Sequence, residues 1–455
     1  MEDGKYSNRR RRRQQKSSGI NGMIVILAVL FIVMAVMLVA KSCSKSDTTD
    51  TPATSSSEAS TSNTESSTPD VPRVVSTASV GVTGDVLMHK PVIDSATVTD
   101  GNYDFSALFT YIQDYYKSFD FMVANLETTL GGTDAGEYSG NPYFNCPDGI
   151  VDALKNAGVD MLLTANNHTY DTGANGFIRT QQVIKDKGLL HLGTRESESA
   201  PNYIVQEING IKIGMLCYTY ETGDTRNGEK SLNFVTVKKE HGPLINSFDY
   251  NDIQSFYTEV QTSLNAMRTA GAEVTMMYIH WGDEYQLTQN VTQESIAQQL
   301  CELGVDVIVG GHPHVVQPFD TLTSSTGHKS YCIYSLGNAV SNQRRELMSS
   351  SPNGHTEDGV IFGVEFTKWS NGTVEVSGIS ILPTWVNKQA NGNTYAYTIV
   401  PLDVKLASWE DFNIQYTNYT YGSYERTMTI LGTGVNECRQ ALGLQSLPLT
   451  NNKTE

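Results

Sequence analysis

The chain has 455 residues, of which 39% are hydrophobic and 38 are glycine, a composition typical of a globular α/β protein rather than a fibrous or disordered one. The formal net charge is −17, and it is unevenly spread, since residues 1–45 hold nine Lys and Arg but two acidic residues. The remaining part carries 23 basic and 47 acidic residues, which argues against nucleic acid as a partner, because phosphate recognition needs a basic surface.

An apolar run from Ile20 to Ala40 is long enough to cross a bilayer, which takes about 20 helical residues. Six basic residues lie within residues 9–16, whereas two lysines follow the run at residues 41–45. The positive-inside rule therefore predicts a cytoplasmic basic tail (residues 1–19), a transmembrane anchor (residues 20–41) and an extracellular remainder, which places the protein in the cell membrane.

Two other fates of this apolar run stay open. A cleaved signal peptide needs a shorter apolar core and a small-x-small cleavage site. Lipid attachment at Cys43 would need a short motif of small residues before the cysteine, and Lys41 interrupts that motif. An uncleaved anchor fits the length of the run better than either.

Residues 42–72 are rich in Ser and Thr, with acidic residues and prolines and almost no apolar side chains. Such a segment cannot bury enough surface to fold, so we expect a disordered linker that lifts the following domain off the membrane. The expected globular domain spans residues 73–405. A C-terminal extension, residues 406–455, is expected to be helical around Thr427–Ala441.

Within the domain, short apolar runs alternate with amphipathic stretches. The expected strands of its first part are Ala78–Thr83, Phe121–Ala124, Val159–Thr164, Leu189–Leu192, Ile211–Tyr218, Val274–Ile279 and Val305–Val309. The expected helices are Phe105–Phe119, Asp148–Ala157, Gly173–Lys187, Asp252–Ala270 and Glu294–Leu303. This alternation with short links predicts an α/β architecture. A second sheet or an antiparallel extension is suggested by four later runs, Tyr331–Leu336, Gly359–Phe366, Thr373–Ile381 and Thr394–Val400.

Polar residues able to bind metal ions directly follow five of these strands. They are Asp85 and His89 in GDVLMH, Glu127 in NLE, Asn167, His168 and Asp171 in ANNHTYDTG, His280 in IHWGDEY, and His312 and His314 in GGHPH. Ligands of open α/β sheets bind at the carboxyl ends of strands, so we expect these groups to converge. Their mixture of carboxylate, imidazole and amide oxygen suits divalent metal ions.

Each of these residues has an ordinary structural explanation when taken alone. Asp85 would be a turn or N-cap residue, Asn167 and His168 loop residues that tolerate positive φ, His280 a buried core histidine and Glu127 a solvated acid. The same placement repeated after five strands favours a shared site over five separate explanations.

Six cysteines occur singly, with neither a CxxC pair nor zinc-finger spacing, at Cys43, Cys146, Cys217, Cys301, Cys332 and Cys438. Two interpretations stay open for them. They are buried thiols that act as small hydrophobic groups, or some of those beyond the membrane form a disulfide in an oxidising compartment.

The order of the motifs GDVLMH, NLE, ANNHTYDTG, IHWGDEY, GGHPHVVQP and YSLGN resembles the CapA family of poly-γ-glutamate capsule synthesis proteins. The resemblance covers Ser79 to Asn342, the motif core at residues 79–342. That family resembles the metallophosphoesterase superfamily, so the resemblance implies a four-layer αββα sandwich and a site for two divalent metal ions, Mn, Fe or Zn.

The resemblance also implies roles for individual residues. The implied metal ligands are Asp85 and His314 at a first ion, Glu127 in a bridging position, and Asn167, His280 and His312 at a second ion. His168 corresponds to a general acid or transition-state stabiliser, which Asp171 would orient. Two positions depart from the pattern: Leu87 stands where the superfamily has a histidine, with His89 two residues further on, and Ala339 follows SLGN where an aromatic is usual.

In function, the resemblance implies a membrane-anchored extracellular protein of capsular polymer (poly-γ-glutamate) biosynthesis, attachment or export, acting by metal-dependent hydrolysis or transfer. Two alternatives stay open, a non-catalytic polymer-binding or scaffold subunit of a capsule machinery and a general extracellular metallophosphoesterase. The expected partners are the cell membrane, an anionic extracellular polymer or its precursor, and other capsule-synthesis membrane proteins. Because the acidic domain would repel a polyanion, Arg344 and Arg345 are candidates for a local basic patch, or else a solvated surface pair.

Overall fold

The computed structural model describes residues 71–98, 101–223, 229–350, 353–403, 412, 414 and 417–450. Val71–Glu455 forms one compact unit. The expected cytoplasmic tail and anchor, and the linker up to residue 70, lie outside the described residues and stay predictions. Within the described part of the chain, no helix is both long and apolar enough to cross a membrane. The expected domain boundaries stay predictions too.

The larger of two main sheets has eight strands among the described residues, in the order β17-β16-β15-β1-β2-β3-β4, with β14 beside β1. Their bounds are β1 Val74–Val86, β2 Phe121–Leu126, β3 Met161–Leu163, β4 Leu190–Leu192, β14 Asn338–Val340, β15 Asp358–Trp369, β16 Val374–Asn391 and β17 Thr394–Pro401. Strands β1 to β4 run parallel, whereas β15, β16 and β17 extend the sheet antiparallel. The expected antiparallel extension is therefore confirmed for the last three strands.

The smaller main sheet has seven described strands, in the order β12-β13-β11-β10-β6-β5, with β9 beside β6. Their bounds are β5 Tyr203–Ile208, β6 Ile211–Tyr220, β9 Ser247–Phe248, β10 Val274–His280, β11 Val307–Gly311, β12 Val316–Thr323 and β13 Lys329–Leu336. Its central strands are parallel and its edges, β5 and β12, are antiparallel. A separate short hairpin pairs β7 Ser231–Leu232 with β8 Val235–Thr236.

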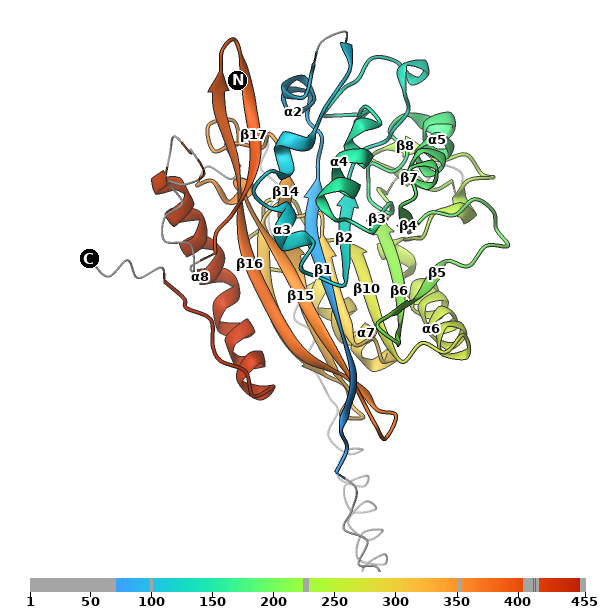
Figure 1. Ribbon diagram of the computed structural model, residues 1–455. Helices are drawn as coiled ribbons and strands as arrows, with labels where there is room; N and C mark the ends of the chain where they lie inside the picture. The colour runs from blue at the N-terminus through green and yellow to red at the C-terminus, as the bar shows by residue number, and fades with distance from the viewer. Residues whose placement is uncertain are drawn as a thin grey trace, which may run out of the picture. The chain divides into compact units, whose positions relative to one another are not determined.

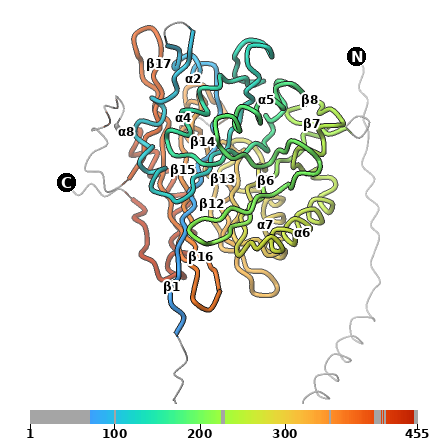
Figure 2. Tube along the Cα trace, turned by 45° about the vertical axis from the view of Figure 1, so that its right-hand side comes forward, coloured from blue at the N-terminus to red at the C-terminus, as the bar shows by residue number. Residues whose placement is uncertain are grey.

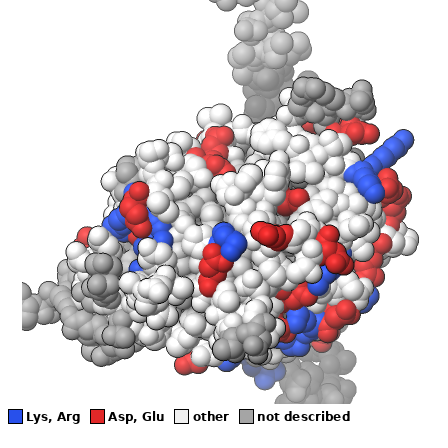
Figure 3. Space-filling view, turned by 90° about the horizontal axis from the view of Figure 1, so that it is seen from above, with Lys and Arg blue, Asp and Glu red and all other residues white. Residues whose placement is uncertain are grey.

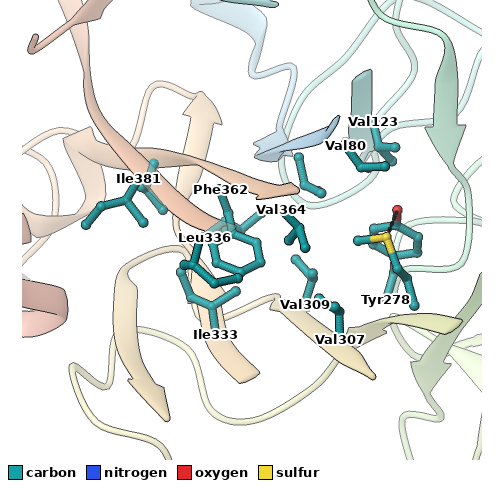
Figure 4. Close-up of a cluster of buried hydrophobic side chains, with 14 of the residues drawn as sticks. Val80, Val123, Tyr278, Val307, Val309, Ile333, Leu336, Phe362, Val364 and Ile381 are labelled. Carbon is teal, nitrogen blue, oxygen red and sulfur yellow. Dashed lines mark hydrogen bonds between the residues drawn. The ribbon is translucent and has the colours of Figure 1, made fainter. Parts of the chain in front are cut away.

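One hydrophobic core joins the two main sheets (Figure 4). Val80 and Phe362 of the larger sheet, and Val309 and Ile333 of the smaller sheet, all belong to it and are almost fully buried. Both sheets also bury their other faces, and β2 is buried at every position. Parallel strands covered on both faces read as continuous apolar runs, which is why they stood out in the sequence.

Helices cover the outer faces of both sheets. The described helices and 3₁₀ turns are α2 Lys90–Ser95, η2 Ser106–Phe109, α3 Gln113–Tyr116, η3 Thr133–Ala135, α4 Gly149–Ala157, α5 Gly173–Asp186, η5 Gly242–Leu244, η6 Tyr250–Asp252, α6 Ile253–Thr269, α7 Val291–Leu303, η7 His355–Glu357 and α8 Thr417–Ala441. Helices α2, α3 and α4 pack on the larger sheet, and α6 and α7 on the smaller sheet. The expected mixed α/β class is confirmed.

The C-terminal helix α8 lies along β16 and β12, one strand from each main sheet, and its apolar side chains join the core between them. It lies on the opposite side of the molecule from α6 (Figures 1 and 2). Helix α8 begins ten residues before the expected Thr427, so it is longer than the sequence pattern indicated.

Local sequence signals explain several element ends. Helix α4 ends at Gly158, which adopts the left-handed conformation that glycine tolerates (φ 108°). Helix α7 starts with a reciprocal capping box between Asn290 and Gln293. The single helix expected over Phe105–Phe119 was wrong, because the segment forms η2 and α3 with turns between them. Its apolar side chains reach the same core, so burial is satisfied without a continuous helix.

Candidate metal centre

The loops after β1, β2, β3, β10 and β11 meet at the carboxyl ends of the parallel strands. In the larger sheet β1, β2 and β3 are neighbours and point the same way (Figure 1), as β10 and β11 do in the smaller sheet. Parallel pairing places their carboxyl ends at one edge, so residues distant in sequence become neighbours. Asp85 and His314, for example, are 229 positions apart and in direct contact.

Asp85 is fully buried at the end of β1. His314 Nδ1 lies 3.1 Å from Asp85 Oδ2, and Asn125 Nδ2 donates a hydrogen bond of 2.8 Å to Asp85 Oδ1. Burial acts against the carboxylate, but His314 and Asn125 outweigh it and lower the pKa of Asp85. Burial likewise opposes the charged imidazole of His314, yet Glu127 and Asp85 raise its pKa to about 9. The two buried carboxylates, Asp85 and Glu127, thus favour a positively charged group between them.

Glu127 lies between the other groups. Its Oε1 is 3.3 Å from His280 Nε2 and 3.8 Å from His314 Nε2, and the side chain is fully buried. Oε1 has no hydrogen-bond partner among the described residues. A buried carboxylate oxygen left unsatisfied is costly, and a cation at this place would satisfy it.

Two groups of side chains among the described residues bring metal-ligating atoms within 4.8 Å of one another. One group holds Asp85, Glu127 and His280, and the other holds Glu127, His312 and His314. Glu127 belongs to both, which is where a bridging carboxylate would stand. The grouping of His280 with Asp85 differs from the division implied by the resemblance, so the assignment of each ligand to a first or second ion stays a prediction.

Asn167 lies against His280, with Oδ1 2.9 Å from His280 Nε2. His312 Nε2 is 3.2 Å from the Tyr220 hydroxyl, whereas His312 Nδ1 has no partner in the described structure. Burial, with the neighbouring His280 and His314, lowers the pKa of His312 well below its usual value, so this imidazole is neutral, the form that binds metal ions. The residues present therefore fit divalent cations, with His312 Nδ1 and Glu127 Oε1 as free ligand atoms.

The backbone at this site is strained. His312 and His314 have φ of 98° and 56°, values that residues with a Cβ rarely adopt. Pro313 separates them, and Asn338 holds the segment by donating a hydrogen bond of 3.2 Å to the His314 carbonyl oxygen. Strain of this kind persists where the surrounding structure holds it in place, and it gathers at functional sites.

His168 stands beside this centre and belongs to neither ligand group. Its Nδ1 is 2.7 Å from Asp171 Oδ2, which also accepts a hydrogen bond from the Phe144 amide. Asn233 donates to Asp171 Oδ1 at 3.0 Å, and the Phe144 ring packs edge-on against the imidazole. The imidazole of His168 is therefore held by Asp171 and by the Phe144 ring, with Nδ1 committed to Asp171 and Nε2 left for another partner.

His89 belongs to neither of the two ligand groups among the described residues. It therefore does not replace the histidine that the superfamily has at the position of Leu87. Its Nδ1 lies 3.2 Å from the Leu87 carbonyl oxygen and 3.3 Å from the Asn342 amide nitrogen, and its ring packs edge-on against Phe144. Burial lowers the pKa of His89 to about 4. His89 is thus a neutral residue at the side of the centre.

Two residues of the centre were missed from the sequence. Asn125 holds the carboxylates of both Asp85 and Glu127 through Nδ2, at 2.8 and 3.4 Å. Tyr220 holds His312 through its hydroxyl and stacks parallel to His280. Both stand at or near the ends of expected strands, so the same placement rule applied to amides and phenols would have found them.

The suggestion that Arg344 and Arg345 form an exposed basic patch is wrong. Arg344 is buried. The guanidinium of Arg345 donates three hydrogen bonds to the carboxylate of Glu357, at 3.1, 3.2 and 2.7 Å. Arg344 also lies 3.4 Å from that carboxylate and donates to the Val386 carbonyl oxygen. Both arginines are paired with a carboxylate of the protein itself, so they do not form a solvated surface pair either.

The five described cysteines are buried free thiols, in keeping with their interpretation as small hydrophobic groups. They are Cys146, Cys217, Cys301, Cys332 and Cys438. No disulfide occurs among the described residues.

Comparison with known proteins identifies the family. Residues 79–343 match the model of a family described as bacterial capsule synthesis protein PGA_cap. The chain is 27% identical over 266 residues to capsule biosynthesis protein CapA of Bacillus anthracis, covering 58% of this chain and 59% of that protein. It is 24% identical over 306 residues to PGA biosynthesis protein CapA of Bacillus subtilis (strain 168), covering 67% and 71%. The similarity thus spans about three fifths of the anthracis protein. Since the family match covers more than half of the chain, this protein belongs to the bacterial capsule synthesis (PGA_cap, CapA) family.

Proposed function

We propose that this protein acts in the biosynthesis, attachment or export of an extracellular anionic polymer of the poly-γ-glutamate kind, through metal-dependent hydrolysis or transfer at the buried centre. The observation that carries the proposal is the buried Oε1 of Glu127, shared by two ligand groups and without a hydrogen-bond partner in the described structure. The family description supports the link to capsule synthesis.

The ligand set supports divalent Mn, Fe or Zn rather than a monovalent ion. Carboxylate oxygens of Asp85 and Glu127, the amide oxygen of Asn167 and the imidazoles of His280, His312 and His314 are the mixture that such ions prefer. When bound, two such ions would supply charge stabilisation and an activated water. Layers of helices, sheet, sheet and helices around one core support a four-layer αββα sandwich of the metallophosphoesterase kind.

His168 has the arrangement of a general acid. Because Asp171 engages Nδ1, the Nε2 atom is left to give a proton to a leaving group. Asn233 and the Phe144 amide fix Asp171 in turn, so the proton would be presented from a fixed direction. None of these residues ligates in either metal group, which separates the proton donor from the charge-stabilising centre.

The proposed setting is the outer face of the cell membrane. The apolar run at residues 20–41 would anchor the chain, and the Ser/Thr-rich linker would hold the domain near a polymer emerging from the membrane. Other membrane proteins of capsule synthesis are the proposed assembly partners.

Metal content and turnover of the purified full-length protein test this function together. We expect bound Mn, Fe or Zn by elemental analysis, and hydrolysis of phosphoester or γ-glutamyl model substrates that is lost in Asp85→Asn. The matched control is Asp186→Asn, which removes a carboxylate from the exposed face of α5. Absence of bound metal under every loading condition would contradict the proposal.

A non-catalytic scaffold is the second candidate function, and one observation favours it. Leu87 is buried where the superfamily supplies a histidine, and His89 does not replace it, so the centre has one ligand fewer. His168→Ala separates the two functions. Unchanged capsule output with this variant would favour the scaffold, whereas lost output with metal retained would favour catalysis.

A further inference from the structure

Lys388 is a cation without a carboxylate partner within ion-pair distance among the described residues. It lies near the end of β16, and its ammonium sits 4.2 Å from the centre of the Tyr395 ring and 5.7 Å from that of Tyr397. It donates a hydrogen bond of 3.0 Å to Asn342 Oδ1, which also accepts from the Tyr397 hydroxyl at 2.6 Å. Two rings and an amide thus hold the position of the ammonium, and none of them neutralises its charge.

A chain of contacts through Asn342, His89 and Phe144 links this ammonium to His168. The Asn342 amide nitrogen is 3.3 Å from His89 Nδ1, and the His89 ring packs against Phe144 at 5.3 Å between centroids. Phe144 packs in turn against His168 at 4.6 Å. Asn342 also lies two residues beyond β14, whose first residue, Asn338, supports the His314 backbone. Lys388 is therefore at the side of the centre where the candidate acid stands.

The surroundings leave the charge of Lys388 available for a ligand. The nearby Arg344 and Arg345 are both engaged by Glu357, and Glu346 lies 4.0 Å from Arg344. Burial and the positive charge of Arg344 lower the pKa of Lys388 and outweigh the opposing negative charge of Glu346, so its ammonium would gain from a bound anion. The end of the molecule seen in Figure 3 carries scattered acidic and basic side chains and no broad basic surface.

We propose that Lys388 is an anion subsite that binds a carboxylate of the acidic polymer while a neighbouring repeat occupies the metal centre. The inference rests on the proposed function and names the feature of the substrate that the centre would recognise. The anion assigned to the subsite is a carboxylate because each repeat of the proposed polymer carries one. The nearby arginines, whose planar forks could also bind it, are already engaged by Glu357, which leaves the lysine ammonium as the available point charge. The subsite also offers a solution to the repulsion between an acidic protein and a polyanion.

Binding of a fluorescent γ-linked oligoglutamate to the full-length protein tests the subsite directly. We expect Lys388→Met to bind it about tenfold more weakly, the loss typical of one charge-assisted contact, and with a weaker dependence on salt. Lys388→Arg should retain most of the affinity because it keeps the charge. The matched control is Lys185→Met, which makes the same change of net charge at an exposed lysine of α5 paired with Glu196.

Three results would overturn the subsite. The first is a wild-type protein that does not bind the oligoglutamate, and the second is a Lys388→Met variant with unchanged affinity and an unchanged melting temperature. The third is a Lys388→Met variant that loses as much affinity for a phosphodiester polymer as for the oligoglutamate, because the subsite would then not be specific for carboxylate. Failure of the proposed catalysis would look different, because Lys388-dependent binding would persist while no substrate is turned over.

Discussion

Glu127 Oε1 lies 3.3 Å from His280 Nε2, in a fully buried position with no hydrogen-bond donor of its own in the described structure. Glu127 directly follows β2 of the larger sheet and His280 ends β10 of the smaller sheet, so their contact joins the two halves of the fold. A cation shared by these atoms would relieve the unsatisfied oxygen and tie the sheets together.

The first prediction concerns this carboxylate. Glu127→Gln keeps the size of the side chain but removes the charge shared by both ligand groups, so we expect loss of at least one metal ion per chain. Elemental analysis after dialysis measures this loss. Glu196→Gln, at an exposed position, should keep the wild-type content. Full metal occupancy in Glu127→Gln would remove its role as a ligand.

The second prediction separates proton transfer from metal binding. Asp171→Asn would leave His168 Nδ1 without its carboxylate partner, so we expect turnover to fall by about 10²-fold or more while metal content is unchanged. The double variant with His168→Ala should be no slower than His168→Ala alone, because the two residues act as one unit. Additive losses in steady-state rates would show that Asp171 acts elsewhere.

The third prediction concerns the ion cluster that holds Arg344 and Arg345. Burial acts to raise the pKa of Glu357, but its hydrogen bond to Arg345 and the charge of Arg344 outweigh this and lower the pKa below the ordinary glutamate value of about 4.5. Its folded pKa is thus below its unfolded pKa, so its contribution to stability is present above about pH 4.5 and is lost as the pH falls through the folded value. Glu357→Gln should cost about 3–5 kcal/mol at neutral pH, since two cations lose their partner.

Denaturant unfolding from pH 7 to pH 3 measures this dependence. The difference between wild type and Glu357→Gln should shrink toward the acid end of the range. The control, Glu375→Gln, changes a carboxylate in an exposed part of β16 that contacts Trp369. A difference that stays constant with pH would mean that packing, and not charge, accounts for the loss.

The fourth prediction uses two glycines of α8. A Cβ at Gly434 would clash with the backbone carbonyl of Phe319 on β12, which cannot move aside easily, so we expect Gly434→Ala to destabilise the fold by about 1–3 kcal/mol. A Cβ at Gly422 would meet the flexible end of Arg426, so Gly422→Ala should be neutral or stabilising by up to about 1 kcal/mol. The melting temperature should therefore fall in Gly434→Ala and stay unchanged or rise in Gly422→Ala. A stabilising Gly434→Ala would show that α8 does not pack tightly on β12.

The sequence by itself determined the α/β class, the positions of most strands and helices, and the polar residues that follow the strands. It could do so because hydrophobic periodicity and turn residues are local signals, and because the carboxyl ends of parallel strands share an edge. Asp85, Glu127, Asn167, His280, His312 and His314 were all found in this way. Their roles as ligands stay predictions.

Only the tertiary structure decided which groups touch. The burial of Arg344 against Glu357, the support of His312 by Tyr220, and the position of Lys388 beside the centre depend on the order of strands in two sheets. Asp85 and His314, which are 229 positions apart, meet there, and no local pattern encodes such a distance. The physical reason is that burial and charge pairing are set by the neighbours that the chain brings together, whereas periodicity is set by each segment alone.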